Sequence, residues 1–352
     1  MYRVGVIGLG SIAEGYGQPD DPNSYCHVAG ILHGRSVELA AVADLQEERR
    51  QGFREKWGGV LGSFADYASH QDLLEENPDI VAVCVRGPQH SAVMMDVIAA
   101  GPRAIFLEKP PTCSLAEMDE MVAAARAKSI PITVSYSRHW APHVLRLQKL
   151  VQEGLIGDVQ TVVGYTGHSF LSFASHVTDL ICQFAGYCPR AVFARGRVSG
   201  EAPEGYEPEP ALDAMIVEFA GRIADDPHGI AGFQVGVNGE HGGFYCDVFG
   251  TKGLVRAGIY IPAHARDGEG KTLDLSEHGM PENAADAERP SVFTVAYDQI
   301  AGYLDGGPLP ACTNQDFIAV HEIGFAGIES VLTNRRVELP NTNRTRKVFA
   351  NG

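Results

Sequence analysis

The sequence predicts an α/β protein with two domains, the first of which contains a doubly wound parallel sheet. Its 352 residues exceed what one typical hydrophobic core holds. Strand-like and helix-like segments alternate up to about residue 135, as in a parallel sheet covered on both faces. Beyond that point, strand-like segments follow one another closely, as in an antiparallel sheet.

The first domain is predicted from short apolar runs with helical stretches between them. Residues 91–100 form a helix-like stretch that stops at Gly101 and Pro102. A second helix is expected over residues 114–128, because Ser114 and Glu117 have the spacing of a capping box. The expected strands are residues 4–7, 37–43, 80–85, 104–107 and 130–136.

The second domain is expected to begin near Ser135, so that the domains cover residues 1–135 and 136–352. A helix is expected over residues 144–153, and residues 201–210 and 263–290 have the composition of loops. The expected strands are residues 159–165, 191–198, 215–219, 232–237, 245–249 and 254–257.

The composition of the chain limits the kinds of molecule that it is expected to bind. The formal net charge of −16 disfavours binding to nucleic acid or to anionic lipid. No apolar stretch reaches the roughly 20 residues that span a bilayer, and the N-terminus does not resemble a signal peptide. Seven scattered cysteines without a C-x-x-C pair indicate reduced thiols. We therefore expect a cytoplasmic protein that binds neither nucleic acid nor membranes.

A phosphate-binding fingerprint lies at the start of the chain. Residues 4–7 form a strand that runs into Gly8-Leu9-Gly10-Ser11-Ile12-Ala13, a G-x-G-x-x-A pattern. The glycines allow a tight turn and close approach of a pyrophosphate, which the start of a helix attracts. The pattern predicts a Rossmann domain in which Gly8, Gly10, Ser11 and Ile12 contact a dinucleotide. The alternative is a glycine turn with a purely structural role.

Asp44 ends the second predicted strand and favours NAD over NADP. A carboxylate there accepts hydrogen bonds from the adenosine ribose and repels a 2′-phosphate. Arg49 and Arg50 follow closely and can soften this preference, so NADP stays possible. The segment of residues 14–26 lengthens the usual spacing between the glycines and the carboxylate. It is either a loop that reaches over the active site or a passive surface loop.

Several motifs, in order along nearly the whole chain, resemble one enzyme family. Leu107-Glu108-Lys109-Pro110 ends a strand, and residues 134–142 (VSYSRHWAP) resemble the segment that opens the second domain of that family. Residues 153–157 (EGLIG), residues 250–253 (GTKG), and His176 with Asp179 complete the pattern. The chain thus resembles the glucose-fructose oxidoreductase / inositol dehydrogenase (Gfo/Idh/MocA) family. The resemblance implies an open, mostly antiparallel second sheet, and a homodimer or homotetramer formed through it.

The resemblance gives Lys109 and His176 the catalytic roles. Lys109 follows a strand at the edge where such sheets bind ligands, so its amine can donate to a substrate oxygen. Glu108 is expected to orient it beside the cofactor, and Lys109-Pro110 is a candidate cis peptide. His176 is the candidate base, since its ordinary pKa of about 6.5 suits proton transfer. The alternatives are a solvated loop lysine and a core histidine.

The helix expected at residues 174–185 places Asp179 one turn after His176, where it can bind substrate or tune the histidine. Ser172 stands where many members of the family carry an acidic residue. Serine can bind a hydroxyl but holds no charge, so the substrate is expected to differ from inositol unless Asp179 compensates. Phe170 and Phe173 make this stretch more apolar than a polyol site requires.

Further contacts are expected around the cofactor and the substrate. His90 matches a histidine of the family near the nicotinamide, and Arg86 can contact the pyrophosphate or an anionic substrate group. Tyr136 and Arg138 lie at the domain junction and are candidate substrate contacts, while Tyr165 is a candidate for stacking on a ring. A surface salt bridge is the alternative for Arg86, and packing is the alternative for Tyr136, Arg138 and Tyr165. The spacing of histidines and cysteines predicts no metal site.

The leading hypothesis is an NAD(P)-dependent dehydrogenase acting on CH–OH groups of a sugar, cyclitol or related small molecule. Two alternatives stay open. One is an NAD-dependent glycosidase with no net redox change, and the other is a dinucleotide-sensing protein without catalysis. The appearance of NADH during turnover distinguishes them.

Overall fold

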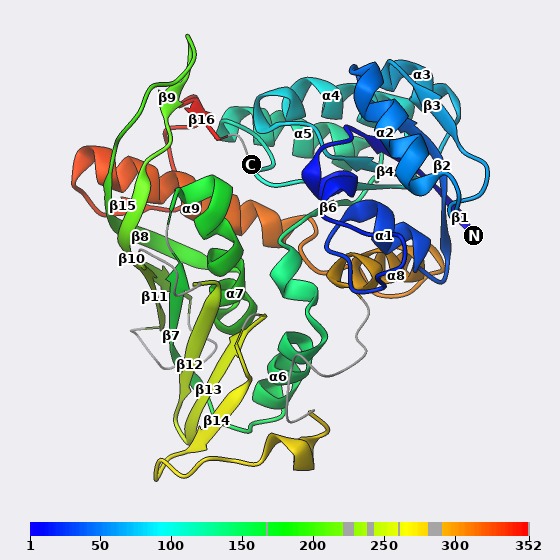
Figure 1. The fold of residues 1–352 in the computed structure, drawn as a ribbon. Helices are drawn as coiled ribbons and strands as arrows, with labels where there is room; N and C mark the ends of the chain where they lie inside the picture. The colour runs from blue at the N-terminus through cyan, green and yellow to red at the C-terminus, as the bar shows by residue number, and fades with distance from the viewer. Residues whose placement is uncertain (167, 221–228, 238–242, 260, 281–290, 351–352) are drawn as a thin grey trace. The chain divides into compact units, whose positions relative to one another are not determined.

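The computed structural model describes residues 1–166, 168–220, 229–237, 243–259, 261–280 and 291–350. Their contacts divide the chain into two compact units. Unit 1 contains residues 1–140 and 291–314, and unit 2 contains the described parts of residues 141–280 together with residues 315–350. Figure 1 colours the chain from its N-terminus to its C-terminus and labels the elements.

Unit 1 is built on a six-stranded parallel sheet with the order β3-β2-β1-β4-β5-β6. The apolar runs that predict these strands are buried on both faces, and residues such as Val6, Val81 and Phe106 have no exposed surface. The direction of strand order reverses between β1 and β4, the place where such sheets bind ligands. The strands are β1 (Tyr2–Ile7), β2 (Val37–Ala43), β3 (Ala65–Tyr67), β4 (Ile80–Val83), β5 (Ala104–Leu107) and β6 (Ile132–Val134).

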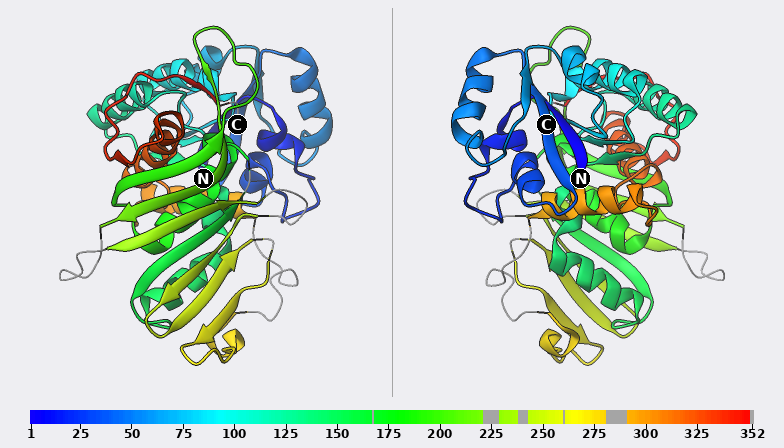
Figure 2. Two further views of the ribbon diagram at one scale, coloured as in Figure 1. Left: turned by 90° about the vertical axis from the view of Figure 1, so that its left-hand side faces the viewer. Right: turned by 90° about the vertical axis from the view of Figure 1, so that its right-hand side faces the viewer.

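Helices flank this sheet in Figures 1 and 2. Two of them begin where the sequence contains a cap or a proline: Ser114 Oγ accepts from the Glu117 N–H at 3.2 Å, and Pro88 lies in the first turn of α4. The described helices of unit 1 are α1 (His27–Leu32), α2 (Glu47–Trp57), α3 (His70–Glu75), α4 (Gly87–Ala100), α5 (Leu115–Ala127), α8 (Val292–Leu304) and the short turns η1 (Ser11–Gly15) and η2 (Ser137–Trp140).

Unit 2 contains an eight-stranded sheet with the order β14-β13-β12-β7-β11-β10-β8-β15. Neighbouring strands are antiparallel except for β7 and β11. The strands are β7 (Val159–Thr166), β8 (Pro189–Arg197), β10 (Ala211–Phe219), β11 (Ile230–Gly236), β12 (Tyr245–Gly250), β13 (Gly253–Gly258), β14 (His264–Asp267) and β15 (Val337–Glu338), and β9 (Glu207–Pro208) pairs separately with β16 (Val348–Phe349).

Helices of unit 2 lie on one face of that sheet, and Figure 2 (left) looks onto the face without them. Glycines let α7 approach closely, because a Cβ at Gly164 would lie 2.4 Å from Val177 and one at Gly232 would lie 2.9 Å from Ile181. The described helices are α6 (Pro142–Gln152), α7 (Ser175–Ala185), α9 (Gln315–Thr333) and the turns η3 (Phe170–Ala174) and η4 (Leu275–His278). None of the described helices is both long and apolar enough to span a bilayer.

The predicted fold class is confirmed, with a parallel sheet followed by a mostly antiparallel one. The domain limits differ from the expected 1–135 and 136–352 in two respects. Unit 1 extends to Trp140, and residues 291–314 return to it. The return has a physical cause: Trp140 donates to Gln299 at 3.1 Å, and the Val134 N–H donates to the Cys312 carbonyl at 2.9 Å.

Two segments predicted as loops contain regular structure. Residues 201–210 include β9, and residues 263–290 include β14 and η4, while residues 281–290 lie outside the described residues. β14 is an edge strand held by pairing with β13, and the sequence His264–Asp267 has little alternation to indicate it.

The helix that follows the fingerprint is interrupted. Residues Ser11–Gly15 form a single π-helical turn, and α1 begins only at His27. The intervening segment is anchored rather than passive. Glu14 accepts from Lys56 and from Trp57 at 3.1 and 3.0 Å, and Ser291 donates to the Ser24 carbonyl at 2.7 Å.

Replacement of Gly30 by alanine tests the packing of α1 on α8. The new Cβ would lie 2.6 Å from the Phe293 Cβ and 2.8 Å from its carbonyl carbon. We expect Gly30→Ala to lower the free energy of unfolding by about 1–3 kcal/mol, measured by urea titration. Gly302→Ala is the control within α8, because nothing lies within 4 Å of its Cβ. Equal stability of the two variants would contradict the packing described.

Candidate functional site

The predicted cofactor residues of unit 1 converge at one edge of its sheet. β1, β2, β4 and β5 run parallel, so the residues that follow them lie at the same edge. These residues are Gly8, Gly10, Ser11 and Ile12 after β1, Asp44 after β2, Arg86 after β4, and Glu108 and Lys109 after β5. This edge contains the switch point between β1 and β4.

The glycine loop has the geometry that a pyrophosphate needs. Gly8 has a φ of +90°, and a Cβ there would lie 2.8 Å from the Cys84 carbonyl oxygen. A Cβ on Gly10 would meet nothing within 4 Å, so the backbone there faces open space. The residues present therefore fit a dinucleotide.

Asp44 connects the end of β2 to this loop. Its Oδ2 accepts from the Leu9 N–H at 2.8 Å, and its Oδ1 accepts from the Gln46 N–H at 2.9 Å. Arg49 Nη1 lies 3.4 Å from Oδ2. Oδ1 keeps capacity for a further hydrogen bond, whereas Oδ2 already accepts from Leu9 and Arg49. Backbone hydrogen bonds thus hold the Asp44 carboxylate in place, and the guanidinium group of Arg49 lies beside it.

The contact of His90 with the cofactor stays a prediction, and the structure shows which protein groups hold its imidazole. Its imidazole is fully buried, with Nδ1 2.7 Å from the Pro110 carbonyl and Nε2 2.9 Å from the Val85 carbonyl. Burial lowers the pKa of His90 more than these carbonyls and the charge of Glu108 raise it. His90 therefore braces the loop after β4 against the loop after β5, where the Lys109-Pro110 peptide is cis.

Glu108 is almost fully buried directly beside Lys109. Its Oε1 lies 3.0 Å from His27 Nε2, and its Oε2 accepts from the Lys109 N–H at 3.3 Å. Burial alone raises the pKa of Glu108, but the hydrogen bond and charge of His27 and the charge of Lys109 outweigh it and lower the pKa. The Lys109 side chain is only half-buried, while Arg86 is exposed.

Sequence reasoning missed His27 and Tyr297. The Tyr297 hydroxyl lies 3.0 Å from His27 Nδ1, which completes a buried chain from α8 through α1 to Glu108. Burial raises the pKa of Tyr297 well above its usual range. No motif indicated this chain, because its members are separated by 81 and 270 positions from His27.

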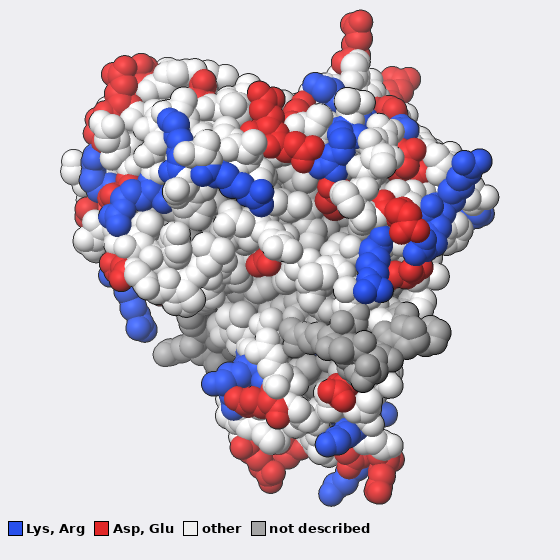
Figure 3. All heavy atoms as spheres, turned by 180° about the vertical axis from the view of Figure 1, so that it is seen from behind, with Lys and Arg blue, Asp and Glu red and all other residues white. Residues whose placement is uncertain are grey.

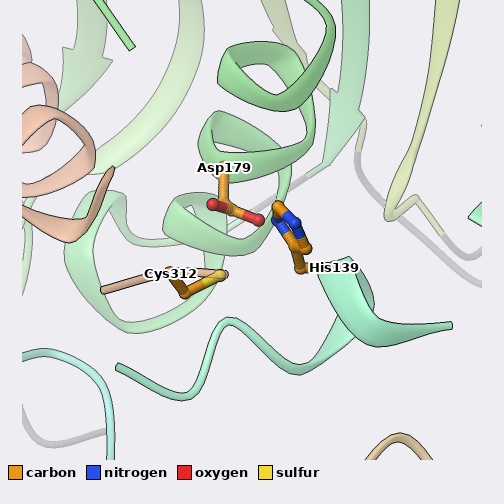
Figure 4. Close-up of side chains that lie close together, drawn as sticks. All are labelled: His139, Asp179 and Cys312. Atoms are coloured by element: carbon orange, nitrogen blue, oxygen red, sulfur yellow. The ribbon is translucent and has the colours of Figure 1, made fainter. Parts of the chain in front are cut away.

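Arg138 lies in η2 and Tyr136 lies directly before it. Both side chains are almost fully buried in unit 1. The Arg138 guanidinium lies 5.9 Å from the centre of the Tyr25 ring. Figure 4 shows His139 on η2 and Cys312 in the segment before α9, with ligand atoms within 4.8 Å of each other.

In unit 2, Ser172 lies in η3, and His176 and Asp179 lie on α7, as Figure 4 shows for Asp179. The His176 side chain is nearly buried and packs edge-on against Phe244, with ring centres 6.1 Å apart. Asp179 has no exposed surface and accepts a hydrogen bond from Tyr187 at 2.9 Å. Its burial agrees better with a role in orienting α7 than with direct substrate contact.

The acidic group missing at position 172 is supplied by Glu209. Its Oε2 accepts from Ser172 Oγ at 2.6 Å, and its Oε1 accepts from the Ser172 N–H at 2.9 Å and from the Leu171 N–H. Burial raises the pKa of Glu209 more than these hydrogen bonds lower it. The sequence contains four glutamates between residues 201 and 210, and no pattern singles out this one.

Two aromatic residues, Phe170 and Tyr165, pack within unit 2, and for Tyr165 packing is the alternative to a ligand contact. Phe170 is buried against α9, where a Cβ on Gly327 would lie 2.5 Å from its ring. Tyr165 alternates along β7 with Gly164, which faces α7, so Tyr165 lies on the opposite face of the sheet. There it stacks on Tyr245 at 4.6 Å and is not placed to stack on a ligand near His176.

Charge is mixed on the surface of the described residues. On the face in Figure 3, lysine and arginine side chains lie interspersed with aspartate and glutamate. Several are paired, such as Arg336 with Glu218 at 2.6 Å and Arg256 with Asp247 at 2.6 Å. Positive charge is therefore neutralised locally in these places.

Known proteins resemble both parts of the chain. Residues 2–136 match the Gfo/Idh/MocA model, described as an oxidoreductase family with an NAD-binding Rossmann fold. The myo-inositol 2-dehydrogenase of Thermotoga maritima is 24% identical over 72% of this chain and 75% of its own. The trans-1,2-dihydrobenzene-1,2-diol dehydrogenase of Sus scrofa is 30% identical over 47% of this chain and 46% of its own.

Among solved structures, a levoglucosan dehydrogenase in complex with NADH and levoglucosan has the same fold. It aligns with a TM-score of 0.74 at 17% identity, over 97% of this chain and all of that one. The fingerprint, the strand order and the sequence matches agree with one another. Together they show that residues 2–136 match the NAD-binding Rossmann domain of the Gfo/Idh/MocA family of oxidoreductases.

Proposed function

We propose that this protein is an NAD-dependent dehydrogenase that oxidises a secondary or anomeric hydroxyl of a sugar, cyclitol or related ring diol, or reduces the matching carbonyl. One observation carries the proposal: Lys109 follows β5 at the cofactor edge of the parallel sheet, next to the buried carboxylate of Glu108. The relatives named for inositol, levoglucosan and dihydrobenzenediol support a ring that carries hydroxyl groups.

Residues of unit 1 bind and orient the dinucleotide in this proposal. The backbone from Gly8 to Ser11 accommodates the pyrophosphate, and Asp44 accepts hydrogen bonds from the adenosine ribose. Arg86, exposed at the same edge, contacts the pyrophosphate or an anionic substrate group. NAD+ supplies the acceptor for the hydride of the substrate.

The chemical step needs a donor to the substrate oxygen and a base for its proton. Lys109 donates a hydrogen bond to that oxygen and stabilises the negative charge that develops on it. His176 accepts the hydroxyl proton, and the carbonyl product follows from loss of the hydride. Tyr136 and Arg138 contribute substrate contacts, and Ser172 acts through the carboxylate of Glu209 that it binds.

The open face of the unit 2 sheet supports a homo-oligomer. Phe193, Ile216, Phe233 and Val163 are successive cross-strand neighbours on β8, β10, β11 and β7. Phe193 and Ile216 are 37% and 41% exposed, which is unusual for large apolar side chains in adjacent positions. The ion pair between Arg256 and Asp247 lies in the same cross-strand row, as polar groups border many interfaces. We infer that a second copy of the chain covers this face.

Replacement of Lys109 by methionine tests the catalytic assignment. The variant loses the donor to the substrate oxygen, so turnover should fall roughly 10²-fold or more while binding of NADH persists. Turnover is measured as NADH formation over a panel of sugars, cyclitols and aromatic dihydrodiols. Lys149→Met is the control, since that lysine is largely exposed on α6. Unchanged turnover in Lys109→Met would refute the assignment, and product formed without NADH would indicate a glycosidase.

Replacement of Asp44 by asparagine tests cofactor choice. Asparagine keeps an acceptor oxygen for the Leu9 N–H but removes the charge that repels a 2′-phosphate, and Arg49 stays nearby. The ratio of kcat/KM for NADP+ to that for NAD+ should rise roughly tenfold or more. Glu55→Gln, an exposed change on α2, should leave the ratio unaltered. An unchanged ratio in Asp44→Asn would exclude Asp44 as the discriminating residue.

Replacement of Ile216 by lysine tests the oligomer. A charge at the centre of the apolar row should shift the protein from a dimer or tetramer to a monomer, measured by light scattering after size exclusion. Leu332→Lys is the matched control, because Leu332 is equally exposed at 41% but lies on helix α9. A monomeric wild type, or an Ile216→Lys variant with the wild-type mass, would argue against this interface.

A further inference from the structure

A chain of three side chains leads from the interior of unit 1 to Lys109. Tyr297 on α8 contacts His27 on α1, and His27 contacts Glu108 at the end of β5. His27 has no exposed surface, and aromatic rings surround its imidazole: Phe106 at 4.7 Å, Phe293 at 4.6 Å and Tyr297 at 5.9 Å between ring centres. No water-facing atom completes the chain, so its hydrogen bonds are made within the protein.

The donor at the Glu108 end of this chain is fixed, whereas the roles at the Tyr297 end depend on the tautomer of His27. A carboxylate only accepts hydrogen bonds, so His27 Nε2 carries a proton and donates it to Glu108 Oε1 at 3.0 Å. Nδ1 then faces the hydroxyl of Tyr297 at 3.0 Å. Because burial raises the pKa of Tyr297, this hydroxyl keeps its proton and can donate it to Nδ1. The imidazole is thereby held in one orientation with its donor directed at Glu108.

The other titratable groups around Glu108 do not compete for its charge. Burial raises the pKa of Cys26 to about 11 and that of Cys84 well above its usual value, so both thiols stay neutral. Burial also lowers the pKa of His90 on α4, which disfavours a positive charge there. Among these groups, Glu108 and Lys109 are left as the opposite charges that act on each other.

We propose that His27 and Tyr297 are positioning residues for Lys109: they hold the Glu108 carboxylate beside it, and this carboxylate keeps the lysine in the ammonium form that donates to substrate. The inference rests on the proposed catalytic role of Lys109. The proposal gives a function to two features of unit 1: the interruption before α1, which carries His27, and the return of α8, which carries Tyr297. Both features are needed to bring His27 and Tyr297 to the end of β5.

The direction of the expected effect follows from the charges. Loss of the His27 donor leaves Glu108 buried with one partner fewer, which raises the pKa of its carboxyl group. Without His27 the Glu108 carboxylate is no longer held in position, so Lys109 interacts less with its negative charge and gives up its own proton at lower pH. Activity that depends on the ammonium form is then lost at lower pH on the alkaline side.

The test compares His27→Leu with His27→Gln. Glutamine can donate to Glu108 and accept from Tyr297, whereas leucine can do neither. Two midpoints are measured: the alkaline limb of the kcat/KM profile, and the pH dependence of acetylation of Lys109 by acetic anhydride in the substrate-free protein, read by mass spectrometry. In His27→Leu both midpoints should fall by about one pH unit or more, and in His27→Gln by less than about a third of that.

Further variants separate positioning from packing. Phe293→Leu disturbs the rings around His27 without touching its hydrogen bonds, so it should lower the melting temperature and leave both midpoints in place. Tyr297→Phe removes one hydroxyl and should lower both midpoints by less than His27→Leu does. If the His27→Leu variant does not fold, the two midpoints of Tyr297→Phe alone test the inference.

Unchanged midpoints in Tyr297→Phe and in any folded His27→Leu would overturn the inference, as would equal shifts in His27→Leu and His27→Gln. The acetylation midpoint does not depend on catalysis. Loss of the proposed function is recognised separately, because in that case Lys109→Met retains its turnover.

Discussion

The hydrogen bond between His27 and the buried carboxylate of Glu108 is the interaction on which unit 1 most depends. It joins α1 to the end of β5, and Tyr297 extends it to α8. A buried carboxylate is tolerated only where donors compensate for its lost hydration. Removing one partner of such a buried pair costs about 3–5 kcal/mol in proteins. Tyr297 thereby adds to the contacts of Gln299 and Cys312 that hold residues 291–314 in the first unit.

The same carboxylate links stability to chemistry. The strands of the parallel sheet bring the glycine loop, Asp44 and Lys109 to one edge, but they do not set the charge of the lysine. That charge depends on the neighbours of Lys109, and the neighbours are themselves buried and hydrogen-bonded. His90 contributes by bracing the loops after β4 and β5 through two carbonyl groups. The groups around Lys109 are therefore held in fixed positions.

Unit 2 uses its sheet in two ways. One face is covered by α6, α7 and α9, and glycines in β7 and β11 let α7 approach closely enough to fix the position of His176. The other face keeps a row of apolar side chains exposed. The carboxylate of Glu209 stabilises the turn before α7 through two backbone N–H groups and the Ser172 hydroxyl. Ser172 stands where many members of the family carry an acidic residue, and a carboxylate from the segment of residues 201–210 contacts it.

The sequence by itself determined the fold class, the cofactor fingerprint and most strands, because apolar runs and glycine turns are local signals that survive without tertiary context. It also predicted Lys109 and Asp44 as site residues, since the ends of parallel strands are where ligands bind. Only the tertiary structure revealed the contacts of His27, Tyr297 and Glu209 and the packing roles of Phe170 and Tyr165. Those roles depend on hydrogen bonds and ring contacts between residues far apart in the chain, and no local pattern encodes such pairings.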